Sequence, residues 1–338
     1  MDKRIYLDNG FLNIGYILHL PVPFIFCVGG RGTGKTYGAL KYVLDNGVKF
    51  GYMRRTQSQA DLINKPEFSP FKAICRDTGR EIVSVPITKY NAAFYDGIID
   101  GDKVTPNGAP LGYTLALSTI SNLRGFDMSD VTLLIYDEFI PEKHERPLKN
   151  EASALFNAYE TINRNRELTG NRPLKVLCLA NANNIANPIF DELGIINKVY
   201  SMAQKQQVIS INEARGYALI MLANSPISER KKETALYRLT SGTEFSAMAI
   251  NNDYNVNYTN HSAVNLMEYS PIFTVNGITV YRHKSAALLY ATNHTSGGAV
   301  KITDRIYKKR YKNYILDCDA NGTIIFESLA VKTKLLEI

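Results

Sequence analysis

Short apolar runs alternate with helix-like stretches through the first half of the chain. Residues 23–28 are apolar on both faces, as expected of a strand inside a parallel sheet, and a glycine-rich turn and a helix over about residues 35–46 follow. The same pattern predicts further strands at 48–53, 131–136 and 175–180 and a helix near 150–164. Strands that alternate with helices in this way predict an α/β sheet with helices on both faces.

The pattern changes at two further places. Between residues 81 and 117, apolar stretches separated by Gly and Asp-Gly turns predict short antiparallel strands. Beyond residue 212, a charged, helix-like stretch at 228–241 precedes strands at 272–275, 278–281 and 323–326 and a basic helix near 301–314. We therefore expect three parts: a domain at 1–212, a linker or lid at 213–255, and a smaller C-terminal α/β domain at 256–338.

Composition excludes several classes of protein. The chain has 338 residues, 45% hydrophobic and 21% charged, which are values of globular rather than disordered chains. No apolar run reaches the roughly 18 residues of a membrane-spanning helix, and Asp8, Asn9 and Asn13 interrupt any signal-peptide core. The four cysteines form no CxxC pair, which argues against a zinc ribbon or a disulfide framework. The net charge of +7 is spread over both halves and is compatible with nucleic-acid contact without requiring it.

A phosphate-binding motif lies between the first strand and the first long helix. Residues 29–36 read Gly-Gly-Arg-Gly-Thr-Gly-Lys-Thr and match G-x-x-x-x-G-K-[ST] in full. Backbone N–H groups would surround phosphate oxygens, Lys35 would reach the β- and γ-phosphates, and Thr36 would bind Mg²⁺. A chance match in a glycine-rich turn is the alternative, which the strand–loop–helix context disfavours. The predicted ATP site comprises Gly29, Gly30, Arg31, Gly32, Thr33, Gly34, Lys35 and Thr36, with ATP and Mg²⁺ as ligands.

An acidic pair ends the apolar strand that begins at Thr132. Asp137 is placed to hold Mg²⁺ through water, as a Walker B aspartate does, and Glu138 is placed to polarise the attacking water. An acidic strand end in solvent is the alternative. The second acid favours hydrolysis over phosphoryl transfer to a metabolite, so a small-molecule kinase is the weaker hypothesis.

Asparagine and arginine side chains are further candidates for the site of ATP hydrolysis. Asn181 ends a further buried strand and could sense the γ-phosphate; Asn183 is its rival, and a plain turn role is the alternative. An arginine offered to a neighbouring subunit's γ-phosphate would raise turnover. The candidates are Arg164, with Arg166 beside it, where the helix dipole alone also favours arginine, and Arg124 and Arg31.

Two basic stretches could contact nucleic acid. Arg54 and Arg55 close the second strand and would contact nucleotide or nucleic acid, or else lie at a solvated strand end. In the basic helix, Tyr307, Tyr311 and Tyr314 are spaced to share one face and pack. Its charges would bind phosphates without reading bases, or would simply be solvated. The candidate nucleic-acid contacts there are Arg305, Lys308, Lys309, Arg310 and Lys312.

Several segments, taken in their order, resemble the DNA packaging ATPases (encapsidation proteins) of phi29-like small tailed phages, which are related to terminase large subunits. The resemblance covers most of residues 24–250 and little beyond residue 255. The segments are GGRGTGKT at 29–36, YMRR at 52–55, LLIYDEFIPEK at 133–143, NEASALFN at 150–157, RNRE at 164–167, LCLANANNIANP at 177–188, ISERKKE at 227–233 and SGTEFSAM at 241–248.

This resemblance implies an additional-strand (ASCE/RecA-like) P-loop ATPase that works as a homopentameric ring. The ring would dock on the portal of an empty prohead in the host cytoplasm, through a packaging RNA, move double-stranded DNA inward, and be absent from the mature virion. The resemblance places Lys35 and Thr36 on the Walker A positions and Asp137 and Glu138 on the Walker B pair. It also places Arg164 on a trans-acting arginine finger and Arg124 on a second basic residue that acts across the subunit interface.

Related terminases carry a C-terminal RNase-H-like nuclease, which needs clustered acids to hold two metal ions. The first hairpin of the C-terminal region, at 273–281, has no acid where the first ligand would lie. Asp317 and Asp319 read as part of a plain turn. We therefore expect a vestigial RNase-H-like domain without cutting activity. An active nuclease is the alternative, and its acids would be Asp304, Asp317, Asp319 and Glu327.

Overall fold

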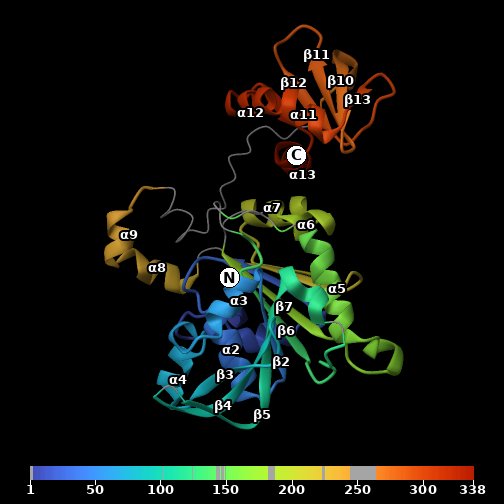
Figure 1. Cartoon of the computed structure of the whole chain (residues 1–338). Helices are drawn as coiled ribbons and strands as arrows, with labels where there is room; N and C mark the ends of the chain where they lie inside the picture. Colours follow the sequence, from blue (N-terminus) through green and yellow to red (C-terminus); the bar gives the residue numbers. More distant parts are fainter. Residues whose placement is uncertain are drawn as a thin grey trace. The chain divides into compact units, whose positions relative to one another are not determined.

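The computed structural model describes residues 3–101, 103–123, 125–141, 145, 148, 150–181, 187–222, 225–243 and 264–338 (Figure 1). The chain divides into two compact units. The first unit contains residues 1–184 and 202–255, and the second contains 185–201 and 256–338.

The described part of the first unit is built on one nine-stranded sheet in the order β3-β4-β5-β2-β6-β7-β1-β9-β8. The strands from β5 to β9 in this order are parallel to one another, while β3, β4 and β8 are antiparallel to their neighbours. The bounds are β1 Phe24–Gly29, β2 Phe50–Arg54, β3 Ile82–Pro86, β4 Ala92–Asp100, β5 Lys103–Ala116, β6 Leu133–Asp137, β7 Lys175–Asn181, β8 Ile209–Asn212 and β9 Tyr217–Leu222. The strands expected from the sequence are thereby confirmed, including the antiparallel group at 81–117.

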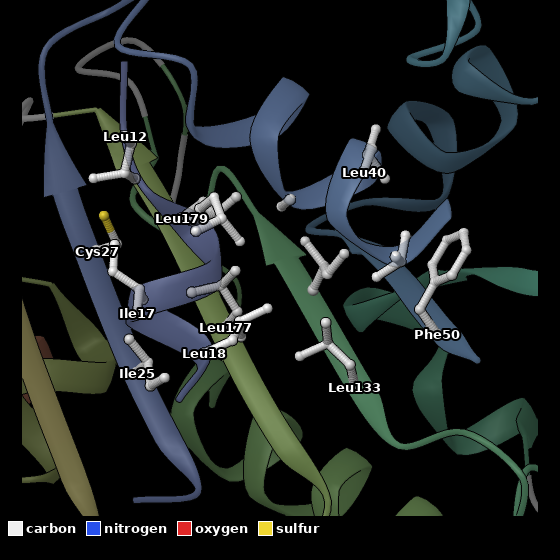
Figure 2. Packing of buried hydrophobic residues seen from close by; sticks show 14 of the residues in the cluster. Leu12, Ile17, Leu18, Ile25, Cys27, Leu40, Phe50, Leu133, Leu177 and Leu179 are labelled. Atoms are coloured by element: carbon white, nitrogen blue, oxygen red, sulfur yellow. The ribbon is translucent and has the colours of Figure 1, made fainter. Parts of the chain in front are cut away.

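Helices cover both faces of this sheet, as the alternation predicted. On one face, side chains from α1, α2 and the start of α4 pack on every second residue of the parallel strands, such as Ile25, Leu133 and Leu177 (Figure 2). On the other face, Phe24 and Phe26 contact Tyr159 of α5 and Phe139. The helices of this unit are α1 Ile14–Leu18, α2 Lys35–Asp45, α3 Gln57–Ile63, α4 Lys72–Thr78, α5 Glu151–Asn163, α8 Pro226–Lys232 and α9 Ala235–Leu239, with short 3-10 segments at Lys3–Ile5, Pro66–Phe68, Leu117–Leu123 and Arg166–Thr169. Helix α6, Pro188–Glu192, and most of α7, Ile196–Gln204, belong to the second unit.

The boundary expected at residue 212 needs correction. β8 ends at Asn212 and pairs antiparallel with β9, which in turn pairs in parallel with β1 from Phe24 to Gly29. Residues 217–222 therefore lie beside the first strand of the sheet rather than in a linker. Every residue of β9 is buried, because the strand lies inside the sheet.

The second unit contains a five-stranded sheet in the order β13-β10-β11-β12-β14. Its core joins alternate residues of β10 and β11, such as Phe273 and Val280, to Tyr307, Ile315 and Val331 from the helices. The bounds are 3-10 Leu266–Glu268, β10 Tyr269–Val275, β11 Ile278–His283, β12 Leu289–Thr292, β13 Val300–Lys301, α11 Asp304–Arg310, α12 Lys312–Ala320, β14 Ile324–Phe326 and α13 Leu329–Glu337.

Two expectations for this unit were wrong. The basic helix is two helices, because the chain bends at Tyr311 (φ −120°, ψ −27°). Tyr307 is fully buried and Tyr311 half-buried, but Tyr314 follows the bend and is 55% exposed, so the three rings do not share one packed face. Asp317 and Asp319 lie in α12 rather than in a turn, because Ile315 and Cys318 of the same segment are buried at helical spacing.

No helix in the portions of the chain described above is long and apolar enough to cross a membrane.

Candidate nucleotide-binding site

The loop between β1 and α2 has the backbone of a phosphate-binding loop. Gly32 and Gly34 have φ of +70° and +83°, a conformation that side-chain-bearing residues rarely adopt. A Cβ at Gly29 would lie 2.5 Å from Cβ of Leu222 on β9, so the neighbouring strand leaves no room for a side chain. The loop ends at the first turn of α2, where free N–H groups and the helix dipole attract anions.

Lys35 lies inside this loop. Its Nζ donates hydrogen bonds to the carbonyl oxygens of Gly29 (3.0 Å) and Gly30 (2.8 Å), and it lies 3.4 Å from Oδ1 of Asn181. Burial lowers the pKa of Lys35 to about 8, because leaving water disfavours the charged ammonium. The structure thus brings together Lys35 and Asn181, two of the residues selected from the sequence.

Asp137 is the centre of a second group of polar side chains at the end of β6. Its Oδ2 accepts hydrogen bonds from Thr36 Oγ1 (2.8 Å) and Tyr52 OH (2.7 Å). Burial and the nearby Asp137 carboxylate raise the pKa of Tyr52 well above its usual value, so the phenol remains a donor. A hydroxyl and a carboxylate oxygen side by side are ligands of the kind that Mg²⁺ prefers, so these residues fit the ion that the motif implies.

Glu138 has an unusual backbone and an ion-pair partner. Its φ is +57°, a conformation that costs energy for a residue with a side chain, and its N–H donates to Oδ1 of Asp137 (3.0 Å). Its carboxylate pairs with the guanidinium of Arg54, which also lies 3.6 Å from Oδ2 of Asp137. Arg54 is therefore neither a solvated strand end nor a free nucleic-acid contact, because it bridges both acids of the site.

Arg55 is buried on the other side of the same strand. Its Nε donates to Oε1 of Glu151 (2.8 Å), and a second nitrogen donates to Glu145 (3.0 Å). Tyr136 OH donates to the same Glu151 oxygen (3.0 Å). Arg55 and Glu151 are each 1% exposed, so the expectation that Arg55 meets nucleic acid or solvent was wrong.

Arg164 and Arg166, the candidates for a trans-acting arginine finger, lie away from the phosphate loop of their own chain. Arg164 donates to Asp127 (2.9 Å) and to the Phe126 carbonyl (3.2 Å), and Arg166 donates to the Val131 carbonyl (2.7 Å). These acceptors precede β6, whereas the phosphate loop follows β1. Because β6, β7 and β1 are parallel, Arg164 and the loop lie at opposite edges of the sheet.

Of the remaining residues predicted for the site, the structure describes Arg31 but not Arg124 or Asn183. Arg31 is exposed on the loop, and its carbonyl accepts a hydrogen bond from Lys231 of α8, a residue not singled out from the sequence. Beside the loop, the segment around Phe11 and the face of α2 that carries Tyr37 line a cavity of about 740 Å³. Arg124 and Asn183 lie outside the described residues.

The basic candidates of the second unit gather on one short helix. Arg305, Lys308, Lys309 and Arg310 are exposed on α11, while Lys312 is half-buried at the start of α12. Asp319 pairs with Lys332, and Glu327 accepts hydrogen bonds from Thr292 and the N–H of Asn293. Across the described residues, no three His, Cys, Asp or Glu side chains gather closely enough to hold a metal ion.

Comparison with known proteins gives concordant matches. The family described as Podovirus DNA encapsidation protein (Gp16) matches residues 1–275. The DNA packaging protein of Bacillus phage phi29 is 28% identical over 264 residues, which cover 75% of this chain and 67% of the relative. The DNA packaging protein of Bacillus phage B103 is 29% identical over 237 residues, covering 68% of this chain and 63% of the relative.

Solved structures share the fold. The bacteriophage Phi-29 viral genome packaging motor assembly aligns with a TM-score of 0.64 at 20% identity, over 97% of this chain and 98% of that one. The Phi-28 gp11 DNA packaging motor aligns with a TM-score of 0.63 at 20% identity, over 98% and 96%. Since the family match spans residues 1–275, more than half of the 338 residues, the chain belongs to the Podovirus DNA encapsidation protein (Gp16) family.

Proposed function

We propose that this chain is a subunit of an ATP-driven motor that moves double-stranded DNA into a viral prohead. The observation that carries the proposal is the pairing of Thr36 Oγ1 with Asp137 Oδ2 at 2.8 Å, next to a loop that holds Lys35. This pairing brings the two halves of a Mg-nucleotide site together from positions 101 residues apart. The strand order supports the expected additional-strand class, because β7 separates β1 from β6.

The residues of the site have distinct tasks in this proposal. The loop amides and Lys35 bind the phosphates, and Thr36 and Asp137 hold Mg²⁺, which neutralises charge that develops on the transferred phosphoryl group. Glu138 orients the attacking water, for which its carboxylate must first leave Arg54. Asn181, within 3.4 Å of Lys35, is placed to sense the γ-phosphate.

Hydrolysis is completed by a second subunit in this proposal. Arg164 lies at the edge of the sheet opposite its own phosphate loop, so it serves the site of a neighbour in a ring, which we take to be a homopentamer. Its exposed guanidinium, 45% accessible, would leave Asp127 to reach the γ-phosphate there. Arg166, which is bonded to three carbonyl groups of its own chain, is the weaker candidate.

The partners follow from family membership and from charge. We propose double-stranded DNA, a packaging RNA and the portal of the prohead, with action in the host cytoplasm and release before the virion matures. The exposed basic side chains of α11 are proposed to bind nucleic-acid phosphates. The second unit is proposed to be a non-cutting, RNase-H-like domain, and metal-dependent cleavage of plasmid DNA by the full chain would contradict this.

ATP turnover measured with double-stranded DNA and emptied proheads tests the proposal. We expect turnover to rise when both are present and to be lost in Lys35→Ala, while Lys72→Ala, which removes an exposed lysine that does not line the cavity beside the loop, keeps it. Glu138→Gln should bind ATP without hydrolysing it. Undiminished turnover in Lys35→Ala, or phosphoryl transfer to a metabolite without stimulation by DNA, would refute the proposal.

A further inference from the structure

Helix α8 is attached to the first unit close to the phosphate loop. A Cβ at Gly10, in the segment before α1, would lie 3.1 Å from Cβ of Pro226, the first residue of α8. Ile227 in the next position is buried. The start of α8 is thus fixed by close packing, and its last turn, which carries Lys231, extends to the loop.

The ammonium group of Lys231 lies at the tip of the phosphate loop. Its Nζ donates to the carbonyl oxygen of Arg31, and a Cβ at Gly32 would come within 2.5 Å of it. The buried ring of Tyr237 from α9 lies 5.6 Å from the same nitrogen, a distance at which an aromatic face attracts a cation. Two helices therefore direct this side chain to the loop.

Positive charge accumulates around the loop. Burial, and then the charge of Arg31, lowers the pKa of Lys231. Lys231 in turn contributes to the lowered pKa of Lys35, after the larger effect of burial. Lys231 meets the loop through a carbonyl oxygen that carries no net charge, just as Lys35 does at Gly29 and Gly30. A polyphosphate anion bound in the loop would reduce this repulsion.

We propose that Lys231 binds the polyphosphate chain of the nucleotide, within the same subunit, by exchanging the Arg31 carbonyl for phosphate oxygens. The α8–α9 segment then acts as a lid whose position depends on the occupancy of the loop. This inference rests on the proposed ATPase function and adds a second lysine to it. The ligand it recognises is the phosphate chain, so inorganic tripolyphosphate should be recognised as well as ATP.

Calorimetric titration with Mg-ATP and with tripolyphosphate tests the inference. Lys231→Met keeps the aliphatic stem over Tyr237 and removes the charge. We expect it to bind both ligands about tenfold more weakly or worse, which is the usual effect of losing a charge-assisted hydrogen bond. Lys231→Arg should restore much of the affinity. Arg230→Met is the matched control, because it removes an exposed positive charge from the same turn of α8, and it should bind within about twofold of the unsubstituted protein.

The outcomes separate this inference from the proposed function. If the unsubstituted protein binds no ATP, the proposed function and the role of Lys231 both fail. If the unsubstituted protein and Lys231→Met bind ATP equally well while Lys35→Ala binds none, only the role of Lys231 fails. Equal weakening in Lys231→Met and Arg230→Met would also overturn it. Hydrogen exchange gives a second measurement: ATP should slow exchange of the backbone amides of α8 and α9 in the unsubstituted protein but not in Lys231→Met, and unchanged exchange in both would count against the lid.

Discussion

At the scale of single residues, the phosphate loop holds a lysine whose positive charge is disfavoured by burial. Lys35 is 7% exposed, and burial lowers its pKa from 10.5 to about 8. A shift of this size corresponds to a destabilisation of about 3 kcal/mol while the lysine is charged. Such a cost is typical of groups retained for binding or catalysis rather than for stability.

Substituting Lys35 by methionine should therefore stabilise the nucleotide-free protein. Below about pH 8 the folded and unfolded states both carry the ammonium, so the penalty is fully present there. Between about pH 8 and the 10.5 of an exposed lysine, the folded state loses its proton first and stability rises with pH. We expect Lys35→Met to be about 1 to 3 kcal/mol more stable near pH 7.

Urea unfolding near pH 7 and near pH 9.5 measures this difference. The advantage of Lys35→Met should shrink at the higher pH, since the unsubstituted protein gains stability there. Lys41→Ala is the control, because that lysine is partly exposed on the same helix. A less stable Lys35→Met at neutral pH, or an advantage that does not change with pH, would contradict the assignment.

The sequence allowed prediction of the residues that lie in contiguous motifs, and it failed for their long-range partners. Thr36 and Asp137 each belong to a motif with its own local context, so their meeting could be expected. Arg54 and Glu138 are 84 positions apart, and Lys231 and Arg31 are 200 apart. Their contacts depend on strand order and on the packing of α8, neither of which has a local sequence pattern. The sequence features that pointed to Arg54 and Arg55 are their place at the end of an apolar strand and the YMRR segment, and neither predicts their partners.

At the scale of elements, a buried ion pair joins the middle of the sheet to α5. Arg55 follows β2, Glu151 begins α5, and Tyr136 belongs to β6; their side chains are hydrogen-bonded to one another. Arg54, the preceding residue, bridges the two acids at the end of β6. The pair therefore fixes the ends of β2 and β6 and the start of α5, the helix that ends beside Arg164.

Breaking this pair should destabilise the fold strongly. Glu151→Ala leaves the Arg55 guanidinium buried without its main partner, and we expect a loss of about 3 to 5 kcal/mol in unfolding free energy. The double variant Arg55→Met/Glu151→Leu should lose much less than the sum of the single variants, because it leaves no unpaired charge. Denaturant unfolding of both single variants and the double variant measures the coupling.

The exposed pair Lys41–Asp45 supplies the reference for that measurement. Both side chains are substantially solvent-accessible, so Asp45→Ala should cost about 0.5 kcal/mol or less. A cost for Glu151→Ala as small as this, or a double variant as unstable as the summed single variants, would rule out a structural role for the buried pair.

Local sequence patterns predicted most elements but not how they combine. The strands and helices of the first half appear where the apolar periodicity placed them. β9 was assigned to a linker because the place of a strand in a sheet depends on pairing partners, and its partner β1 is nearly 200 residues earlier in the chain. The bend at Tyr311 was missed because the residues on both sides favour a helix, so no local pattern marks the point at which α11 ends and α12 begins.

At the scale of the whole molecule, the residues of the proposed site lie at two opposite edges of one sheet. The phosphate loop follows β1, and the Arg164 side chain is held near residues 126 and 127, before β6. This separation agrees with catalysis across a subunit interface. It also means that α5 extends from the acidic residues of one site toward the arginine that the proposal assigns to the next.

Mixing two inactive variants should restore activity. Lys35→Ala subunits keep their arginine, and Arg164→Ala subunits keep their nucleotide site. When the two variants are neighbours in a ring, the intact arginine of a Lys35→Ala subunit can reach the intact nucleotide site of an Arg164→Ala subunit. One complete site forms wherever the two variants follow each other in that order. We expect ATPase activity to be lowest in each pure variant and to recover partly at intermediate ratios, as measured by steady-state phosphate release. No recovery at any ratio would contradict action of Arg164 in trans, and Arg172→Ala, which removes another exposed arginine, is the control.

Removing the charges of α11 should change how DNA binding depends on salt. Each phosphate contact contributes about −0.9 to the slope of log affinity against log salt concentration. Alanine at Lys308, Lys309 and Arg310 together should reduce the magnitude of this slope by about 2 to 3 for duplexes of any sequence. The matched control is alanine at Arg282, Lys284 and Lys301, which are also exposed in the second unit. Equal slopes for the two triple variants would refute the proposed contact.

The position of Arg164 opposite its own loop has a consequence for assembly. With Arg164 acting in trans, subunits associate head-to-tail, because the surface that donates the arginine differs from the surface that receives it. An open row of subunits then always has one pocket at one end that no arginine reaches. When the ring closes, an arginine reaches that last pocket as well. The final subunit to join therefore completes two pockets, its own and that of the terminal neighbour. Each earlier addition completes one.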